Sequence, residues 1–357
     1  MAHELVFDRT FAAVYTPCNS VIQSDALREN GLPVLLLEGS FPAGTVVATV
    51  VAVPAFRCPR RKKSTEKTKK KAKEEIDLET RCINLYDHYG MPAPEKSVGT
   101  LTAFLCRTSP EISPSRKRPA VLIIPGGGYA MTSDREADPI ALRFLSRGYV
   151  PFVLRYSCAP NRFPTQLREA AMAMRYIRDN AKEYEVNASM VAAIGFSAGG
   201  HLCGTIGTMF DCPEVQSIAP ARMLRPDALA LCYPVTVGWG ATHEGTMENI
   251  SGGDQQLRQR LSLDRQVRPD MPPTFLWHSR DDDRVPCRNS LILAQAMDEA
   301  GVDFTLHLYR HGWHGLSTAD AQVYRTDVTP ECSWDVPGWL ESCVRFWEET
   351  GFAITDA

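Results

Sequence analysis

The sequence predicts an α/β protein with a mainly parallel central sheet, helices on both faces of the sheet, and a small β-rich N-terminal extension. From about residue 117, short apolar segments alternate with amphipathic ones, which is typical of parallel strands covered by helices. Hydrophobic residues make up 44% and charged residues 23% of the 357 residues, as in an ordinary globular protein. We therefore expect one large α/β domain with additions.

The elements follow from apolar patterning and helix-end signals. Strands are expected over 118–124, 149–157, 190–196, 227–234, 274–279 and 304–310, and helices over 136–148, 163–184, 198–209, 287–301 and 337–350. The second helix has its apolar face at Leu167, Ala171, Met174 and Ile177. Alternation of this kind requires a sheet with helices packed on both of its faces.

Residues 1–78 differ from the rest and are interpreted as the β-rich extension, with residues 79–357 as the main domain. The extension contains valine- and leucine-rich strand candidates and a basic loop at 58–75. The basic run has no interleaved aromatic residues, and the chain has a net charge of −3. We therefore expect a solvated loop or surface helix, and no nucleic-acid partner.

The cysteine content and the N-terminus indicate a cytoplasmic protein. There are 11 scattered cysteines and no CxxC pair, which argues against a secreted disulfide framework. The N-terminus lacks a basic stretch followed by an apolar core, and the apolar stretch at 45–56 is too short to span a bilayer. No membrane association is expected.

The segment GFSAGG at 195–200 joins an expected strand to an expected helix. GxSxG alone is common, but in this context it predicts a serine exposed on a tight turn at the edge of the sheet. Ser197 is the candidate nucleophile, and the small residues Gly195 and Gly199 leave room for neighbouring backbone. The alternative is a helix N-cap serine.

A serine hydroxyl needs a base to remove its proton, and the base needs an acid to orient it. His314 follows the strand 304–310 and is the candidate base, with His311 in a structural role. The acid should follow the strand 274–279, where Asp282 is chosen and Asp281 is its rival. A calcium site at this aspartate triplet is disfavoured, because such loops alternate their ligands.

The segment PGGGY at 125–129 follows the first strong strand and predicts an oxyanion hole. The backbone N–H groups of Gly127 and Gly128 can turn toward a carbonyl oxygen, and that of Ala198 is a further donor. A phosphate loop is disfavoured because neither GK[ST] nor GxGxxG is present.

Together these motifs resemble the α/β-hydrolase superfamily, in the acetyl-esterase and lipase-like branch that includes acetylxylan and other carbohydrate esterases. The resemblance covers roughly residues 80–357, including PGGGY, GFSAGGHLCG, the region around SRDDDRVP, and HGWHGL. It implies an α/β-hydrolase fold, a Ser197–His314–Asp282 triad, and hydrolysis of short-chain acyl esters through an acyl-enzyme. The substrate implied is an acetylated small molecule or oligosaccharide, with no cofactor and no metal, and homodimers are common among comparable enzymes.

The segment 236–272 is too long for a simple connector. We expect it to cover part of the site as a cap or to form a subunit contact, with ordinary surface packing as the alternative. Tyr129, His243 and Trp313 are candidates for the wall of the substrate site.

Two other functions fit the same motifs. A prolyl-oligopeptidase-like serine peptidase shares the sheet and triad, but it usually carries a large propeller that about 80 residues cannot supply. A non-catalytic binding protein with a hydrolase fold normally lacks one or more triad members, whereas Ser197, Asp282 and His314 occur here in the required order.

Overall fold

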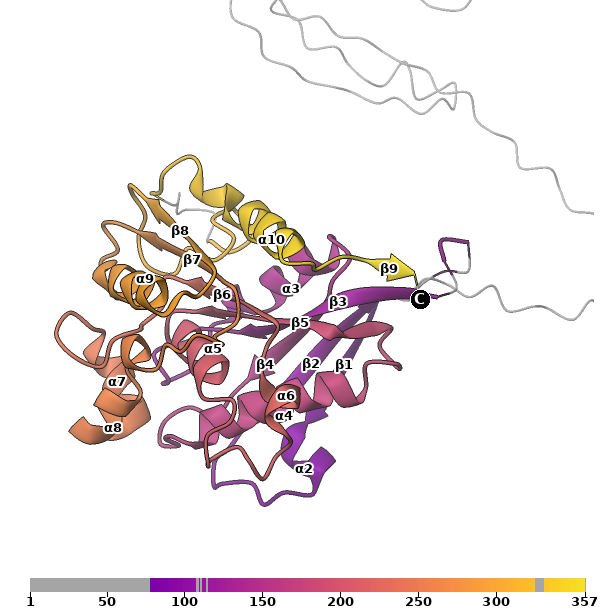
Figure 1. Ribbon diagram of the computed structural model, residues 1–357, viewed down its shortest axis with the longest axis horizontal. Helices are drawn as coiled ribbons and strands as arrows, with labels where there is room; N and C mark the ends of the chain where they lie inside the picture. Colours follow the sequence, from indigo (N-terminus) through magenta and orange to yellow (C-terminus); the bar gives the residue numbers. More distant parts are fainter. Residues whose placement is uncertain (1–77, 107–108, 110, 114, 325–330, 357) are drawn as a thin grey trace, which may run out of the picture. The chain divides into compact units, whose positions relative to one another are not determined.

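The computed structural model describes residues 78–106, 109, 111–113, 115–324 and 331–356 (Figure 1). These residues belong to one unit that runs from Glu74 to Ala357. The predicted β-rich extension as far as residue 77, with its basic loop at 58–75, lies outside the described residues.

The described strands form a mainly parallel sheet, which confirms the predicted fold class. Its order is β1-β2-β4-β3-β5-β6-β7-β8, with β1 and β2 antiparallel at one edge and β9 paired antiparallel to the start of β3. The strands are β1 (Leu78–Asn84), β2 (Thr100–Cys106), β3 (Arg116–Ile124), β4 (Val150–Arg155), β5 (Val186–Phe196), β6 (Ala228–Cys232), β7 (Thr274–Ser279), β8 (Phe304–Tyr309) and β9 (Thr355–Asp356). From β4 through β8 every neighbouring pair is parallel.

Helices cover both faces of this sheet (Figure 1). The α-helices are α2 (Leu85–Tyr89), α3 (Asp138–Leu145), α4 (Thr165–Asp179), α5 (Ala198–Thr208), α6 (Ala221–Leu224), α7 (Glu244–Ser251), α8 (Gln255–Arg260), α9 (Arg288–Ala300) and α10 (Trp339–Glu349). Short 3-10 turns are η1 (Asp134–Glu136), η2 (Leu263–Arg265) and η3 (Val336–Gly338). No helix among the described residues is both long and apolar enough to cross a membrane.

The apolar strand sequences reflect burial on both faces of the sheet. Leu122 and Ile124 of β3 belong to one hydrophobic cluster, shared with helices α4, α5 and α9. Val121 and Ile123 belong to a second cluster, shared with α3 and α10. Because successive side chains of a strand point to opposite faces, a strand covered on both faces is apolar at every position.

Helix α4 shows the predicted amphipathic pattern. Leu167, Ala171, Met174 and Ile177 are all buried in the cluster that contains α4. The helix spans Thr165–Asp179, a few residues shorter at its C-terminal end than the sequence suggested.

The parallel strands place their carboxyl ends at one edge of the sheet. The segments that follow β3, β5, β6, β7 and β8 therefore leave the sheet at the same edge. In open α/β sheets this edge is where functional residues gather. All the predicted site residues lie in these segments or in the helical region after β6.

Candidate active site

Ser197 occupies a strained turn between β5 and α5. Its backbone has φ 53° and ψ −118°, a conformation that is costly for a residue with a side chain. A Cβ on Gly195 would lie 2.2 Å from the carbonyl oxygen of Gly199, and one on Gly199 would lie 2.2 Å from that of Ile124. The strand-turn-helix context predicted for the serine is therefore present, and both glycines are required by close backbone packing.

The backbone on each side of Ser197 is tied to the end of β6. Ser197 donates its N–H to the carbonyl of Cys232 at 3.0 Å, and its own carbonyl accepts the N–H of Val235 at 3.1 Å. These bonds hold the strained turn in place.

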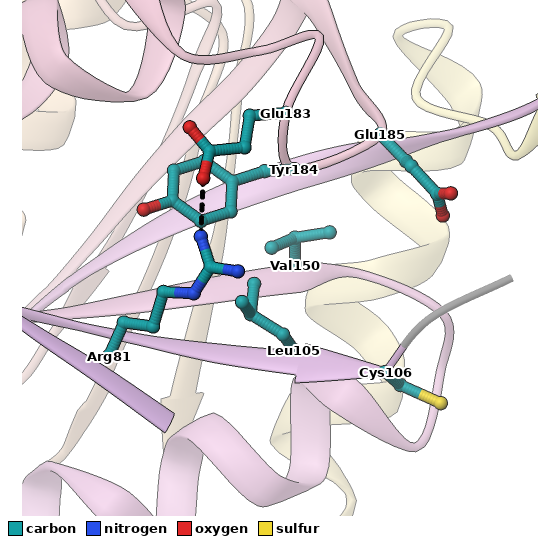
Figure 2. Close-up of a pocket in the computed structure, with 7 residues that line it drawn as sticks. All are labelled: Arg81, Leu105, Cys106, Val150, Glu183, Tyr184 and Glu185. Atoms are coloured by element: carbon teal, nitrogen blue, oxygen red, sulfur yellow. Dashed lines mark hydrogen bonds and ion pairs between the residues drawn. The ribbon is translucent and has the colours of Figure 1, made fainter. Parts of the chain in front are cut away.

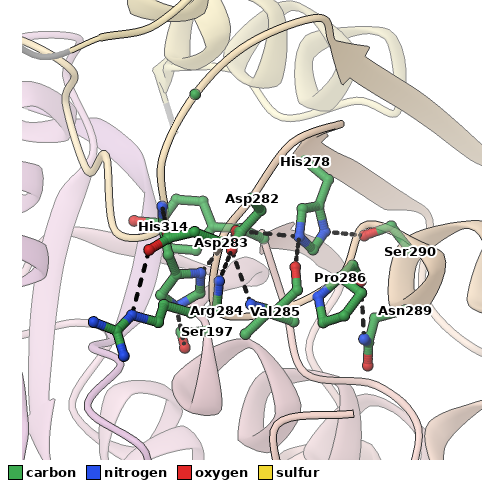
Figure 3. A network of polar contacts seen from close by, with 12 residues as sticks. Ser197, His278, Asp282, Asp283, Arg284, Val285, Pro286, Asn289, Ser290 and His314 are labelled. Carbon is green, nitrogen blue, oxygen red and sulfur yellow. Dashed lines mark hydrogen bonds and ion pairs between the residues drawn. The ribbon is translucent and has the colours of Figure 1, made fainter. Parts of the chain in front are cut away.

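The structure brings Ser197, His314 and Asp282 together (Figure 3). His314 Nε2 lies 2.8 Å from Ser197 Oγ, and His314 Nδ1 lies 2.8 Å from Asp282 Oδ2. Asp282 lies in the loop after β7 and His314 in the loop after β8. A base that contacts a hydroxyl with one nitrogen and a carboxylate with the other has the geometry needed for nucleophilic catalysis.

The other two aspartates of the triplet have different partners. Asp281 Oδ2 lies 2.8 Å from Nδ1 of the exposed His311, and Asp281 Oδ1 accepts the N–H of Gly312 at 2.8 Å. Asp283 accepts the backbone N–H of His314 at 3.2 Å. The structure thus brings Asp282, and not its rival Asp281, to the imidazole of His314. Among the described residues no cluster of histidine, cysteine and carboxylate side chains is suited to hold a metal ion.

The Asp282 side chain is almost fully buried and well supplied with donors. Its Oδ1 accepts the backbone N–H groups of Arg284 at 2.9 Å and Val285 at 2.8 Å. Burial alone would raise the pKa of the Asp282 carboxyl, but hydrogen bonds with His278 and His314 bring the pKa below its ordinary value. The carboxylate therefore stays ionised at neutral pH, beside the imidazole that it orients.

His278 is a neighbour of Asp282 that the sequence analysis did not identify. It is fully buried at the end of β7, with Nε2 3.3 Å from Asp282 Oδ2 and 2.9 Å from the carbonyl of Val285. Its Nδ1 lies 2.7 Å from Ser290 Oγ (Figure 3). A carbonyl oxygen can only accept, so Nε2 carries a proton. The sequence feature that could have indicated His278 is a histidine within the apolar strand segment TFLWHS at 274–279.

The glycine loop after β3 lies against the serine turn. A Cβ on Gly126 would lie 2.9 Å from Ser197 Cβ. Gly127 and Gly128 have φ of 126° and 65°, which favour glycine. Within the part of the chain that the structure describes, no hydrogen bond uses the backbone N–H of Gly127, Gly128 or Ala198. These groups are available to a ligand, as an oxyanion hole requires.

Glu136 and Tyr233 form a buried network beside this loop and were also missed from the sequence. Glu136 Oε2 accepts the N–H of Gly126 at 2.8 Å, and its Oε1 accepts the hydroxyl of Tyr233 at 2.8 Å. The Tyr233 oxygen in turn accepts the N–H of Ser317 at 3.0 Å, and the Tyr233 ring packs edge-on against His314, with 5.1 Å between centroids. The network therefore links the glycine loop to the loop that carries His314.

The three residues expected to line the substrate site have different environments. The expectation for Tyr129 is wrong, because its side chain is fully buried and its hydroxyl lies 2.8 Å from His201 Nδ1. Burial removes the large apolar surface of a tyrosine ring from water, and the hydroxyl keeps a hydrogen-bond partner in the core. Trp313 is half-buried against Tyr324, and His243 is half-buried. Their contact with substrate stays a prediction.

The segment 236–272 contains α7, α8 and η2. Asn249 of α7 donates its side-chain N–H to the carbonyl of Gly128 at 2.8 Å. His243 is the N-cap residue of the same helix and accepts the N–H of Thr246. Helix α7 therefore lies directly against the glycine loop. A subunit contact made by this segment stays a prediction.

A separate hollow of about 300 Å³ lies at the edge of the sheet where the parallel strands β4 and β5 begin, opposite the edge that carries Ser197 (Figure 2). It is lined by residues of β1, β2 and the start of β4, and by the segment before β5. Its most prominent polar group, the Arg81 guanidinium, is paired with Glu183 and lies 5.7 Å from the centre of the Tyr184 ring. The cation is already neutralised, so the hollow offers little to an anionic ligand.

The chain is similar to known esterases and hydrolases. A sequence model described as BD-FAE matches residues 110–220, and one of the prolyl oligopeptidase family matches residues 168–331. An acetylxylan esterase of Xylanibacter ruminicola is 29% identical over 231 residues, which are 62% of this chain and 45% of that protein. The chain spans less than half the length of the curated relatives it matches.

Two solved structures match over most of their own length. An acetyl ester-xyloside bifunctional hydrolase from Caldicellulosiruptor lactoaceticus is 35% identical with a TM-score of 0.62, covering 71% of this chain and 88% of that one. An α/β-hydrolase enzyme from a deep-sea metagenome library is 32% identical with a TM-score of 0.60, covering 76% and 97%. With this fold, this serine turn and these relatives, the chain belongs to the α/β-hydrolase superfamily, in the branch that contains acetyl esterases and carboxylesterases.

Proposed function

We propose that this protein is a serine esterase that removes short acyl groups, with acetyl groups on a carbohydrate as its substrate class. The observation that carries the proposal is the continuous chain of contacts from Ser197 Oγ through the His314 imidazole to Asp282, each 2.8 Å long. In this proposal Ser197 is the nucleophile, His314 the general base and acid, and Asp282 the group that orients the imidazole.

In the first half of the reaction, Ser197 Oγ attacks the ester carbonyl carbon while His314 Nε2 takes the hydroxyl proton. The carbonyl oxygen becomes an oxyanion, which the backbone N–H groups of Gly127, Gly128 and Ala198 stabilise. Loss of one such donor typically costs about 3–4 kcal/mol of transition-state stabilisation. His314 then gives its proton to the departing alcohol oxygen, which leaves an acyl group on Ser197.

In the second half, water attacks the acyl carbon and gives a proton to His314. The same backbone donors hold the second oxyanion. When the bond to Ser197 Oγ breaks, the proton passes from His314 to the serine, and the carboxylic acid departs. The lowered pKa of Asp282 keeps a negative charge beside His314 whenever the imidazole becomes a cation.

The choice of substrate rests on the relatives. One is named an acetylxylan esterase, and a solved structure is described as an acetyl ester-xyloside bifunctional hydrolase. Helix α7, which lies on the glycine loop, is available to limit the space near the ester.

The test is hydrolysis of p-nitrophenyl acetate, butyrate and octanoate and of acetylated xylan oligomers, with Ser197→Ala beside the wild type. We expect acetate to be the fastest ester, sugar acetates to be deacetylated, and the variant to lose at least about 10³-fold in rate. The exposed Ser146→Ala is the matched control and should keep wild-type rates. An active Ser197→Ala enzyme would refute the mechanism, and preference for octanoate would refute the substrate class.

A serine peptidase is the second candidate, because the prolyl oligopeptidase family model matches residues 168–331. That enzyme class uses the same triad on an amide bond. Comparing p-nitrophenyl acetate with glycyl-prolyl p-nitroanilide at equal enzyme concentration separates the two. Turnover of the anilide that depends on Ser197, with little ester hydrolysis, would replace the esterase proposal by this one.

A further inference from the structure

His243 stands at the start of α7, beside the glycine loop. Its Cε1 lies 3.9 Å from the position that a Cβ on Gly128 would occupy, and among the described residues, leaving aside the chain neighbours of Gly128, only Thr246 Oγ1 comes closer, at 3.8 Å. The imidazole therefore lies at van der Waals distance from the position of a Cβ on Gly128, which the glycine leaves open. Asn249, nearly two helical turns further along, donates its side-chain N–H to the carbonyl of Gly128 at 2.8 Å and fixes the helix against the loop.

The helix cap determines which nitrogen of His243 carries the proton. Nδ1 accepts the backbone N–H of Thr246 at 3.2 Å and lies 2.8 Å from Thr246 Oγ1. A backbone N–H can only donate, so a proton on Nδ1 would face another proton. The neutral ring therefore carries its proton on Nε2, and Nε2 is a hydrogen-bond donor.

The surroundings keep this ring neutral. Burial is the main cause that lowers the pKa of His243, and electrostatic interactions with Arg284 and the His314 ring lower it further, while Asp282 and Glu244 raise it. The N-terminal end of a helix also disfavours a cation. Within the described residues no hydrogen bond occupies His243 Nε2. The ring is half-buried, so this donor is held in one orientation and is still accessible to a ligand.

We propose that His243 is a specificity-determining residue, which donates a hydrogen bond from Nε2 to an oxygen of the alcohol part of the substrate next to the ester. This inference rests on the proposed ester hydrolysis. The backbone N–H groups of the glycine loop and Ala198 serve the carbonyl oxygen, and an acetyl group carries no other oxygen. An additional donor beside Gly128 therefore has its partner on the alcohol, as in a polyol or sugar with a hydroxyl adjacent to the esterified one.

The test uses two acetates that differ by a single hydroxyl, trans-2-hydroxycyclohexyl acetate and cyclohexyl acetate. One neutral hydrogen bond corresponds to roughly a 3- to 10-fold difference in kcat/KM. We expect the wild type to prefer the hydroxylated acetate by about this factor.

The variant His243→Asn isolates the donor from the cap. Asparagine is among the best N-cap residues, so it keeps the bond to the Thr246 N–H, but its short side chain cannot reach the site. We expect it to lose the preference for the hydroxylated ester, so that the ratio of kcat/KM for the hydroxylated acetate to that for cyclohexyl acetate falls to about one. His243→Ala should show the same loss of preference and, in addition, a lower unfolding midpoint.

The outcomes separate this inference from the proposed function. A hydroxyl preference that is absent in the wild type or survives in His243→Asn overturns the role of His243, while Ser197-dependent hydrolysis of both acetates leaves the esterase standing. An equal fall in both rates in a folded His243→Asn also overturns it, because the ring would then act on the carbonyl side. No Ser197-dependent hydrolysis of either acetate overturns the proposed function, and the inference with it.

Discussion

Substituting Tyr233→Phe tests the buried network beneath the site. The Tyr233 side chain is 1% exposed, and its hydroxyl both donates to Glu136 and accepts from the Ser317 N–H. Phenylalanine keeps the ring and its contact with His314 but removes both hydrogen bonds. A carboxylate oxygen and a backbone N–H are then left in the interior without these partners.

The size of the effect follows from these two groups. Each buried polar group left without its partner costs about 1–3 kcal/mol. The sum is roughly 2–6 kcal/mol, and we expect the free energy of unfolding to fall by about 3 kcal/mol. Because the same network holds the glycine loop and the loop of His314, we also expect kcat to fall several-fold while KM changes little. Urea unfolding followed by fluorescence, together with ester hydrolysis, measures both quantities.

Tyr149→Phe provides the matched control. The Tyr149 hydroxyl is buried and has no hydrogen-bond partner among the residues that the structure describes, so the same chemical change removes an unpaired polar group. Its free energy of unfolding should stay the same or rise by up to about 1 kcal/mol. If Tyr233→Phe loses less than about 1 kcal/mol, or if the two variants lose equal amounts, the argument from unpaired buried groups is wrong.

Three further predictions concern the serine turn and the acid. Gly199→Ala should fail to fold or should melt far below the wild type, because its Cβ would lie 2.2 Å from the Ile124 carbonyl oxygen. Gly338→Ala is the control and should melt normally, because a Cβ there meets no atom of the described residues within 4 Å. Equal melting temperatures for the two variants would contradict the packing argument. Asp282→Asn should lower kcat by about 10⁴-fold, and Asp281→Asn by no more than a few-fold, in the same p-nitrophenyl acetate assay; the reverse order would exchange the roles of the two aspartates. The folded-state pKa of Asp282 is lowered, so its ionisation contributes stability that is fully present above the unfolded pKa of about 3.9 and is lost as pH falls toward the folded pKa. Urea unfolding between pH 7 and pH 3 should therefore show the gap between wild type and Asp282→Asn narrowing below about pH 4, and a gap that is constant with pH would disprove the linkage.

The sequence pattern was sufficient for the sheet because strands covered on both faces are apolar at every position. The segments around Val121 and Ile194 were identified as strands for this reason, and both are central in the sheet. The antiparallel strands β1 and β2 were not identified, because neither is a continuous apolar run: the edge strand β1 has mixed polarity and no buried residue over 79–84, and β2 begins with half-buried threonines on either side of a buried leucine. Helix α4 was recognised from its 3.6-residue period, which burial of a single face requires.

The members of the candidate site could be read from local signals where the chemistry needs a special backbone. Ser197 was marked by glycines that the crowded turn requires, and the glycine loop by its run of residues able to adopt positive φ. Glu136 and Tyr233 have no such glycine signal, since one lies in a 3-10 turn and the other directly follows β6, and His278 is marked only as a histidine within the apolar strand β7. Tyr129 was misplaced because its position next to the glycines says nothing about which way its ring turns.

The sequence by itself determined the α/β class, the strand-serine-helix turn, and the chain order of serine, acid and histidine, since each depends on neighbouring residues. Only the tertiary structure decided that Asp282 rather than Asp281 meets His314, that the Tyr129 ring lies in the core, and that helix α7 places His243 over Gly128. The physical reason is that these are contacts between segments far apart in the chain. Their distances are set by how strands and helices pack, which adjacent residues do not encode.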